Sequence, residues 1–165
     1  EIFEAKNFVL PLMPNLRTLM VVDSDVTVTS DFLSLPGFSI DNLGGTVELF
    51  GEIGLIRLAN MGNAHTSVYW VNASDFVAFS EYGEVFLAGV AEKAAIRSYE
   101  KAHIDTSYLL IQDLWVAMND RSRILARPAH SIHVYGTDKS ALWYFQRPQF
   151  QDIHTHEESV AIFIS

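Results

Sequence analysis

Two aspartates one residue apart, Asp23 and Asp25, are the residues whose types and spacing most clearly suggest chemistry. They follow a short apolar run over 16–22, whose length and valines predict a strand buried on both faces. Side chains alternate along an extended chain, so both carboxylates would project to one side, where they could bind a divalent cation. The alternative is an ordinary polar turn, because a D-x-D triplet arises by chance about once in such a chain.

Composition restricts the ligands and partners that the chain can have. Its 165 residues fit one domain, and 49% apolar residues suffice for a buried core. A net charge of −9 with 11 lysines and arginines argues against nucleic acid as a partner. The absence of cysteine excludes disulfides and thiolate zinc sites, so a bound metal would have oxygen or imidazole ligands, as magnesium and manganese do.

The N-terminus carries no signal-peptide pattern, and no stretch is long and apolar enough to predict a transmembrane segment. A cytoplasmic or membrane-peripheral location is therefore expected. Since the chain does not begin with methionine, we expect a fragment or a processed chain.

The secondary structure expected around the aspartates indicates one α/β domain over 1–165, without an internal repeat. Leu109, Leu110, Leu114, Ala117 and Met118 recur at helical spacing and predict a helix over 105–118. Further helical segments are expected at 3–8, 32–35, 84–102 and from 72–75 onward. Strands are expected at 16–22, 67–71, 122–126 and 131–135, with a bent strand or strand pair over 46–59.

The segment that contains the aspartates resembles the GT-A-fold glycosyltransferases, especially their glycogenin-like and galactosyltransferase-like retaining group. In that group a strand with a leucine-proline-rich approach leads into the metal-binding D-x-D motif. The matching stretches here are Leu10-Pro11, Pro14-Asn15-Leu16, 19–28 and Asp31. The resemblance implies a GT-A (Rossmann-like) mixed sheet flanked by helices, of which this chain would be the C-terminal part without the nucleotide-binding half.

Two downstream segments extend the resemblance. The family's metal-binding histidine stands in a pattern with a glycine and a lysine, and His133, Gly136 and Lys139 match its spacing, although the family's proline is missing. The family also has a triplet of an acid, a glutamine and a second acid. At the corresponding position of this chain only the first acid, Asp105, matches. Asp105 could act as a base or simply cap the helix predicted over 105–118.

The resemblance implies a hexosyltransferase that moves a sugar from a nucleotide-diphosphate donor, typically a UDP-sugar, to a hydroxyl of a glycan, lipid or protein acceptor. Its location would be the cytoplasm, or the Golgi lumen in a eukaryote. The implied roles are metal binding (Mn²⁺ or Mg²⁺) by Asp23, Asp25 and His133, donor binding by Ser24, Gly136 and Lys139, and catalysis by Asp105. The retaining or inverting outcome stays open.

The alternative function is a non-catalytic α/β interaction module or a degenerate relative of these enzymes, in which the two aspartates form only a polar turn.

Overall fold

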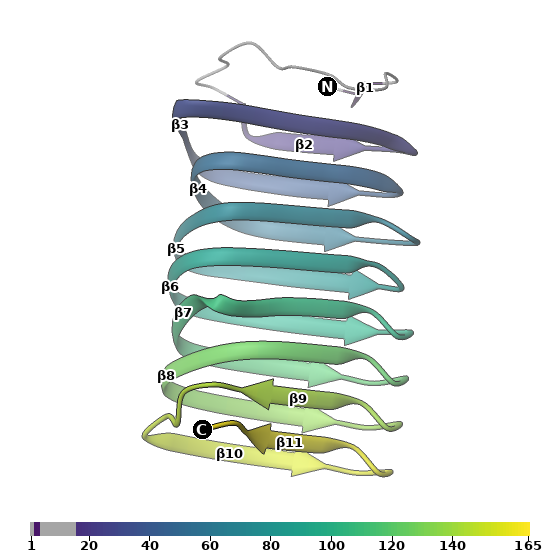
Figure 1. Cartoon of the computed structure of the whole chain (residues 1–165), viewed down its shortest axis with the longest axis vertical. Coiled ribbons are helices and arrows are strands. Elements are labelled where there is room, and N and C mark those ends of the chain that lie inside the picture. Colours follow the sequence, from purple (N-terminus) through teal and green to yellow (C-terminus); the bar gives the residue numbers. More distant parts are fainter. Residues whose placement is uncertain (1, 4–15) are drawn as a thin grey trace.

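The computed structural model describes residues 2–3 and 16–165, with side chains for 16–27 and 35–165. All regular structure in these residues is β-structure, and the strands wind into a parallel β-solenoid of about seven turns (Figure 1). Because this part of the chain contains no helix, the predicted α/β fold and the resemblance to the GT-A family are wrong.

The strands, in chain order, are β1 (Ile2–Phe3), β2 (Thr18–Val21), β3 (Ser24–Asn42), β4 (Gly45–Asn60), β5 (His65–Glu81), β6 (Glu84–Tyr99), β7 (His103–Met118), β8 (Arg123–Gly136), β9 (Ala141–Tyr144), β10 (Phe150–Thr155) and β11 (Val160–Phe163).

Each long strand bends midway and so runs across two opposite faces of the solenoid. We call the face turned to the viewer in Figure 1 the front sheet and the fainter one behind it the back sheet. The front sheet contains the first halves of β3 to β8, followed by β9 and β11. The back sheet contains β2, the second halves of β3 to β8, and β10. Every strand pair is parallel, so one turn of the solenoid, here called a coil, stacks directly on the next.

The coils repeat with a period of about 19 residues. Thr46 pairs with His65, His65 with Glu84, and Glu84 with His103, each step being 19 residues along the chain. The expectation that the chain has no internal repeat is therefore wrong. Residues at equivalent positions form columns along the solenoid axis, separated by the strand spacing of about 4.8 Å.

The core is a single narrow layer between the two sheets, filled by alternate residues of each strand. One inward column of the front sheet is apolar throughout, apart from a buried threonine at position 66. Its buried apolar members are Val47, Val85, Ile104, Ile124 and Leu142. A facing column of the back sheet consists of Ile40, Leu58, Ala78, Ile96, Val116 and Val134. The intervening side chains point outward, so both outer surfaces are available for contacts.

At one edge of the solenoid the strands bend through register irregularities, for example between Leu49 and Ile53 of β4. Gly89 has a φ of 130° there, and a Cβ on it would overlap the carbonyl oxygen of Val71 in the coil before. Only glycine permits this approach of two backbones. The bend therefore depends on backbone geometry as well as on apolar patterning.

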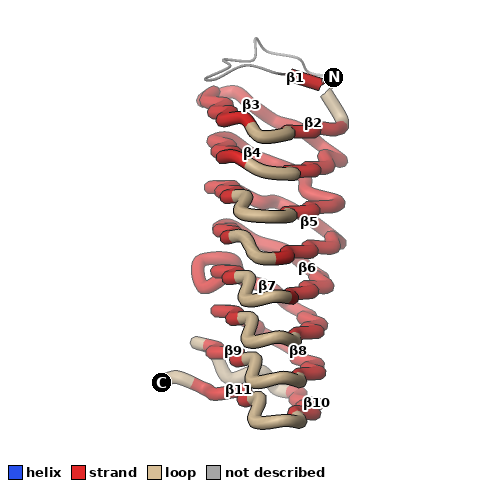
Figure 2. The backbone as a smooth tube through the Cα atoms, turned by 90° about the vertical axis from the view of Figure 1, so that its right-hand side faces the viewer, coloured by secondary structure: helices blue, strands red, loops and turns tan. Residues whose placement is uncertain are grey.

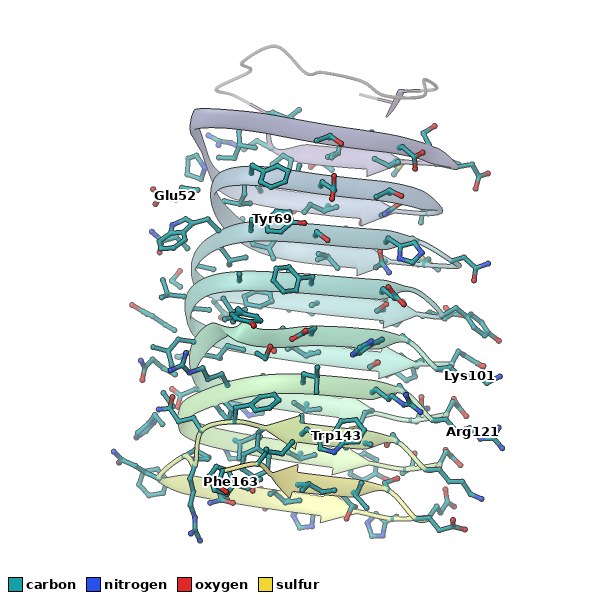
Figure 3. All side chains as sticks on the ribbon, in the orientation of Figure 1. Glu52, Tyr69, Lys101, Arg121, Trp143 and Phe163 are labelled. Atoms are coloured by element: carbon teal, nitrogen blue, oxygen red, sulfur yellow. The ribbon has the colours of Figure 1, made fainter. Side chains whose placement is uncertain are left out.

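The opposite edge consists of tight turns that stack in a row (Figure 2). From the turn between β6 and β7 on, each turn holds two residues with positive φ, such as Glu100 with Lys101 and Asp120 with Arg121. Backbone hydrogen bonds join consecutive turns, with the amide of Lys101 donating to the carbonyl of Asp120 at 2.9 Å. The labelled Lys101 and Arg121 project from this edge into solvent (Figure 3).

A chain of buried polar side chains lies just inside the turns. Thr66 donates from Oγ1 to Asn60 Oδ1 at 2.8 Å and accepts from Asn42 Nδ2 at 3.0 Å. Asn60 Nδ2 in turn donates to the carbonyl of Ala64 at 3.0 Å and lies 3.2 Å from Ser80 Oγ. These bonds satisfy polar groups that no water reaches, and they tie three coils together.

The two long helices predicted over 84–102 and 105–118 are instead the bent strands β6 and β7. The inward residues of β7 stand at 104, 106, 109, 111, 114, 116 and 118. Successive inward residues are two positions apart within a sheet and three positions apart across each bend. This mixed spacing of apolar residues resembles the periodicity of an amphipathic helix. The helical segments expected at 32–35 and from 72–75 onward are also wrong, because these residues lie in β3 and β5.

Several strand predictions are confirmed. The bent strand expected over 46–59 is β4, while the strands at 67–71, 122–126 and 131–135 lie within β5 and β8. Of the run over 16–22, 18–21 form β2, where Leu19 and Val21 alone are buried, so it is not buried on both faces. The helical segment expected at 3–8 lies outside the described residues from residue 4 on. No helix among the described residues could span a membrane.

We expect Asn60→Ala to lower the free energy of unfolding by about 1–3 kcal/mol, because Thr66 and the Ala64 carbonyl would lose a partner inside the protein. Urea denaturation monitored by circular dichroism measures the change. Asn63→Ala, in the same turn but exposed, is the control and should change stability by less than about 0.5 kcal/mol. Equal effects of both substitutions would contradict a structural role for the buried amide.

Gly89→Ala should destabilise the solenoid far more than Gly62→Ala, although both glycines have positive φ. A Cβ at Gly62 meets no atom within 4 Å, so only backbone strain of about 1–2 kcal/mol is expected there. At Gly89 the added carbon also collides with the Val71 carbonyl. Thermal unfolding of the two variants would compare them, and similar melting temperatures would refute the close backbone approach.

Candidate functional site

Asp23 and Asp25 lie at the edge formed by the tight turns, at the start of the coil that β3 begins. Asp23 is itself a turn residue, with a φ of 47°, and both side chains are exposed. The Asp25 carboxylate accepts a hydrogen bond from the backbone amide of Thr46 at 3.0 Å, which links it to the next coil. Ser24 between them donates from Oγ to the carbonyl of Val22 at 3.0 Å. The pair thus occupies the polar turn that was the alternative reading of this motif.

The structure does not bring His133 to the two aspartates. Asp25 is in β3 and His133 in β8, five strand steps away, which is roughly 24 Å along the axis. Asp25 also belongs to the front sheet and His133 to the back sheet. The chain approaching the motif, 10–15, lies outside the described residues.

The other predicted site residues are also dispersed. Asp105 is in β7 of the front sheet, where its carboxylate accepts from the amide and the hydroxyl of Ser107 at 2.9 and 2.6 Å. Gly136 is buried at the end of β8. Lys139 is a turn residue and pairs with Glu158 at 3.4 Å. Their donor-binding and catalytic roles stay predictions.

Within the part of the chain that the structure describes, no group of three or more histidine and acidic side chains is placed to hold a metal ion. The expected manganese or magnesium site from Asp23, Asp25 and His133 is thus not formed by these residues. The prediction of a metal-dependent glycosyltransferase therefore no longer has the fold and the metal site on which it was based.

A different group of side chains lines a pocket of about 330 Å³ on the back sheet, across β6, β7, β8 and β10. Two neighbouring outward columns form it. The first contains Ala95, Trp115, His133 and Asp152, and the second contains Arg97, Ala117, Tyr135 and His154. The regular parallel register places these eight residues together, although the chain separates the first from the last by almost sixty residues.

Trp115 is the central aromatic residue of the pocket. Its indole stacks on the His133 imidazole with ring centroids 5.5 Å apart and planes inclined by 6°. On the other side its column continues with Ala95, whose methyl group is too small to cover the second indole face. The side chain remains 43% exposed, and Tyr135 on the next coil is 56% exposed. Two aromatic side chains are thus held rigidly on a sheet and open to solvent.

The carboxylate of Asp152 orders the imidazoles below Trp115. One of its oxygens lies 2.9 Å from His154 Nε2 and the other 3.4 Å from His133 Nδ1. The hydrogen bond from His133 is the main cause that holds the pKa of Asp152 below its usual value, and the charge of His154 acts in the same direction. His133 therefore has one ring nitrogen engaged by Asp152 while its ring supports the indole.

Arg97 brings a positive charge to the upper side of the pocket. Among the described residues, no carboxylate lies within 4 Å of its guanidinium, whereas Arg57 of the same sheet is paired with Asp41 at 2.7 Å. A guanidinium has five N–H donors and prefers planar anionic partners. Arg97 is thus available to a ligand.

None of the comparisons with known proteins identifies a relative of this chain. No protein-family model matches it, and no curated protein or solved structure matches it significantly. Function must therefore be inferred from the geometry of the described residues.

The sequence reasoning missed this pocket, apart from His133. Trp115 fell in a predicted helix, where an aromatic residue is ordinary core material. The signal that could have revealed the pocket is the repeat: with a period of about 19, Trp115, His133 and Asp152 fall in register.

His133→Ala should raise the pKa of Asp152 toward its ordinary value of 3.8, because the main hydrogen bond to the carboxylate is lost. Since the folded-state pKa is lowered, the stabilisation exists above pH 3.8 and is lost as the pH falls through the lowered value. NMR titration of the Asp152 carboxyl carbon measures the shift. His130→Ala is the control, because His130 pairs with Asp113 at 2.8 Å; an equal shift in both variants would contradict the assignment.

Proposed function

We propose that the chain is a non-catalytic carbohydrate-binding module, whose binding site is the pocket around Trp115 on the back sheet. The observation that carries the proposal is the fixed, half-exposed indole, stacked on one face by His133 and open on the other above Ala95. The proposal retains the interaction module that was the sequence-based alternative, now on a solenoid.

The pocket's composition favours a saccharide over a purely apolar ligand. A pyranose ring has one face of C–H bonds that packs on an aromatic ring, and a rim of hydroxyls that need donors and acceptors. Trp115 and Tyr135 provide aromatic surface, while Asp152, His154 and Arg97 provide hydrogen-bonding groups at its border. Such a pairing of apolar faces with a few polar groups fixes both the position and the orientation of a ring.

The solenoid is suited to binding without a change of shape. Apart from Asp152 and His154 on the edge strand β10, the pocket residues stand on β6, β7 and β8, which are hydrogen-bonded on both sides, so their spacing is fixed before a ligand arrives. Preformed sites lose less conformational entropy when they bind. An aromatic platform fixed on a sheet can therefore bind a sugar chain through few contacts.

We expect the purified protein to bind members of an immobilised array of neutral and acidic oligosaccharides. Trp115→Ala should reduce this binding at least tenfold, whereas Trp115→Phe should retain part of it because an aromatic face remains. Trp70→Ala is the matched control: Trp70 is 53% exposed but lies at the bend of β5, outside the pocket, so its loss should leave binding unchanged. Absence of binding to any glycan, or equal binding by the Trp115→Ala variant, would overturn the proposal.

A further inference from the structure

The charged side chains of the pocket also indicate the charge of its ligand. Resting on the carbohydrate-binding function proposed above, we infer that the saccharide is acidic: its ring lies on the open face of Trp115, above Ala95, and its carboxylate pairs with Arg97.

The placement follows from four residues at the corners of a square on two adjacent strands. Ala95 and Arg97 are alternate residues of β6, and Trp115 and Ala117 are their partners in β7. The two large side chains lie on one diagonal and the two alanines on the other. A hollow therefore lies over each alanine, and the hollow over Ala95 has the indole on one side and the guanidinium on another.

The dimensions of the square suit one sugar ring. Neighbouring coils are about 4.8 Å apart, and alternate residues of a strand are separated by roughly 6.6 Å. A ring stacked on Trp115 would thus have a substituent within reach of the long side chain of Arg97. Among the described residues, the aromatic partner of Trp115 is His133, and Ala95 precedes Trp115 in its column on the other side.

The local charge favours an anion, although the chain as a whole carries −9. The pocket contains one arginine and two histidines against a single carboxylate. That carboxylate, Asp152, already contacts both imidazoles and lies three coils from Arg97. The pocket also contains an exposed indole, and among the described residues the guanidinium of Arg97 has no acidic partner within 4 Å. A planar carboxylate can bind it through two parallel hydrogen bonds.

The experiment compares acidic oligosaccharides with neutral counterparts of the same ring. Oligogalacturonates and their methyl esters form one pair, and glucuronate- and sialate-containing oligosaccharides with their esters form two others. Isothermal titration calorimetry is used throughout. For at least one pair the wild-type chain should bind the acid about tenfold or more tightly than the ester, which retains the ring but has lost the charge.

Arg97→Met should remove this preference by weakening the acid to the level of the ester and leaving the ester unchanged. Arg123→Met, in an exposed position of the front sheet, is the control and should retain the preference. Circular dichroism and thermal unfolding verify that both variants are folded. A carboxylate preference that persists in Arg97→Met would refute the role of Arg97.

The outcomes separate this inference from the function on which it rests. If acid and ester bind within twofold of each other and Trp115→Ala abolishes both, the carbohydrate-binding function stands and the acidic ligand is refuted. If neither acids, esters nor neutral glycans bind, the carbohydrate-binding function itself fails. If simple galacturonate binds as tightly as its oligomers, the site recognises a single acidic ring.

Discussion

The structure depends on one constraint, which is that the backbone of every coil must hydrogen-bond in register to the next coil. The interior leaves little tolerance, because each of the two sheets contributes only one layer of side chains to it. Any slip by one residue would turn an inward column outward. The buried columns are therefore mainly apolar, as at Leu87, Leu109 and Ile124, each fully buried. Close to the turns, the side chain of Asn60 adds a hydrogen bond to the carbonyl of Ala64, and Thr66 donates to the side chain of Asn60.

The same register produces the candidate site. Outward side chains do not have to fill a core, so their identities can vary, but their positions are as fixed as those of the buried ones. Trp115, His133 and Asp152 come from three coils and meet because they occupy one column. Their contacts are a ring stack and a hydrogen-bonded carboxylate, both directed along the axis. The fold thus assembles a composite surface from residues that are distant in sequence.

Sequence reasoning could identify many strands but not the way in which they join. Runs such as 131–135 have clear β character, and the bent strand expected over 46–59 is β4. The helices predicted over β6 and β7 failed because each bend inserts one residue into the alternation. An apolar pattern that counts two, then three, has an average period between those of a strand and a helix.

The predicted site failed for a related reason. The D-x-D motif was read as the end of a parallel strand that delivers carboxylates to a cleft, as open α/β sheets do. In a solenoid the end of a strand is a turn at the edge, and an acid there stabilises the turn or a neighbouring amide, as Asp25 does for Thr46. The more informative signal was the recurrence of acidic or polar pairs followed by a small residue. Glu100-Lys101-Ala102, Asp120-Arg121-Ser122 and Asp138-Lys139-Ser140 occupy successive turns, 20 and 18 residues apart. Turns of this kind recur in the later coils of the solenoid, where two positive-φ residues reverse the chain in a small space.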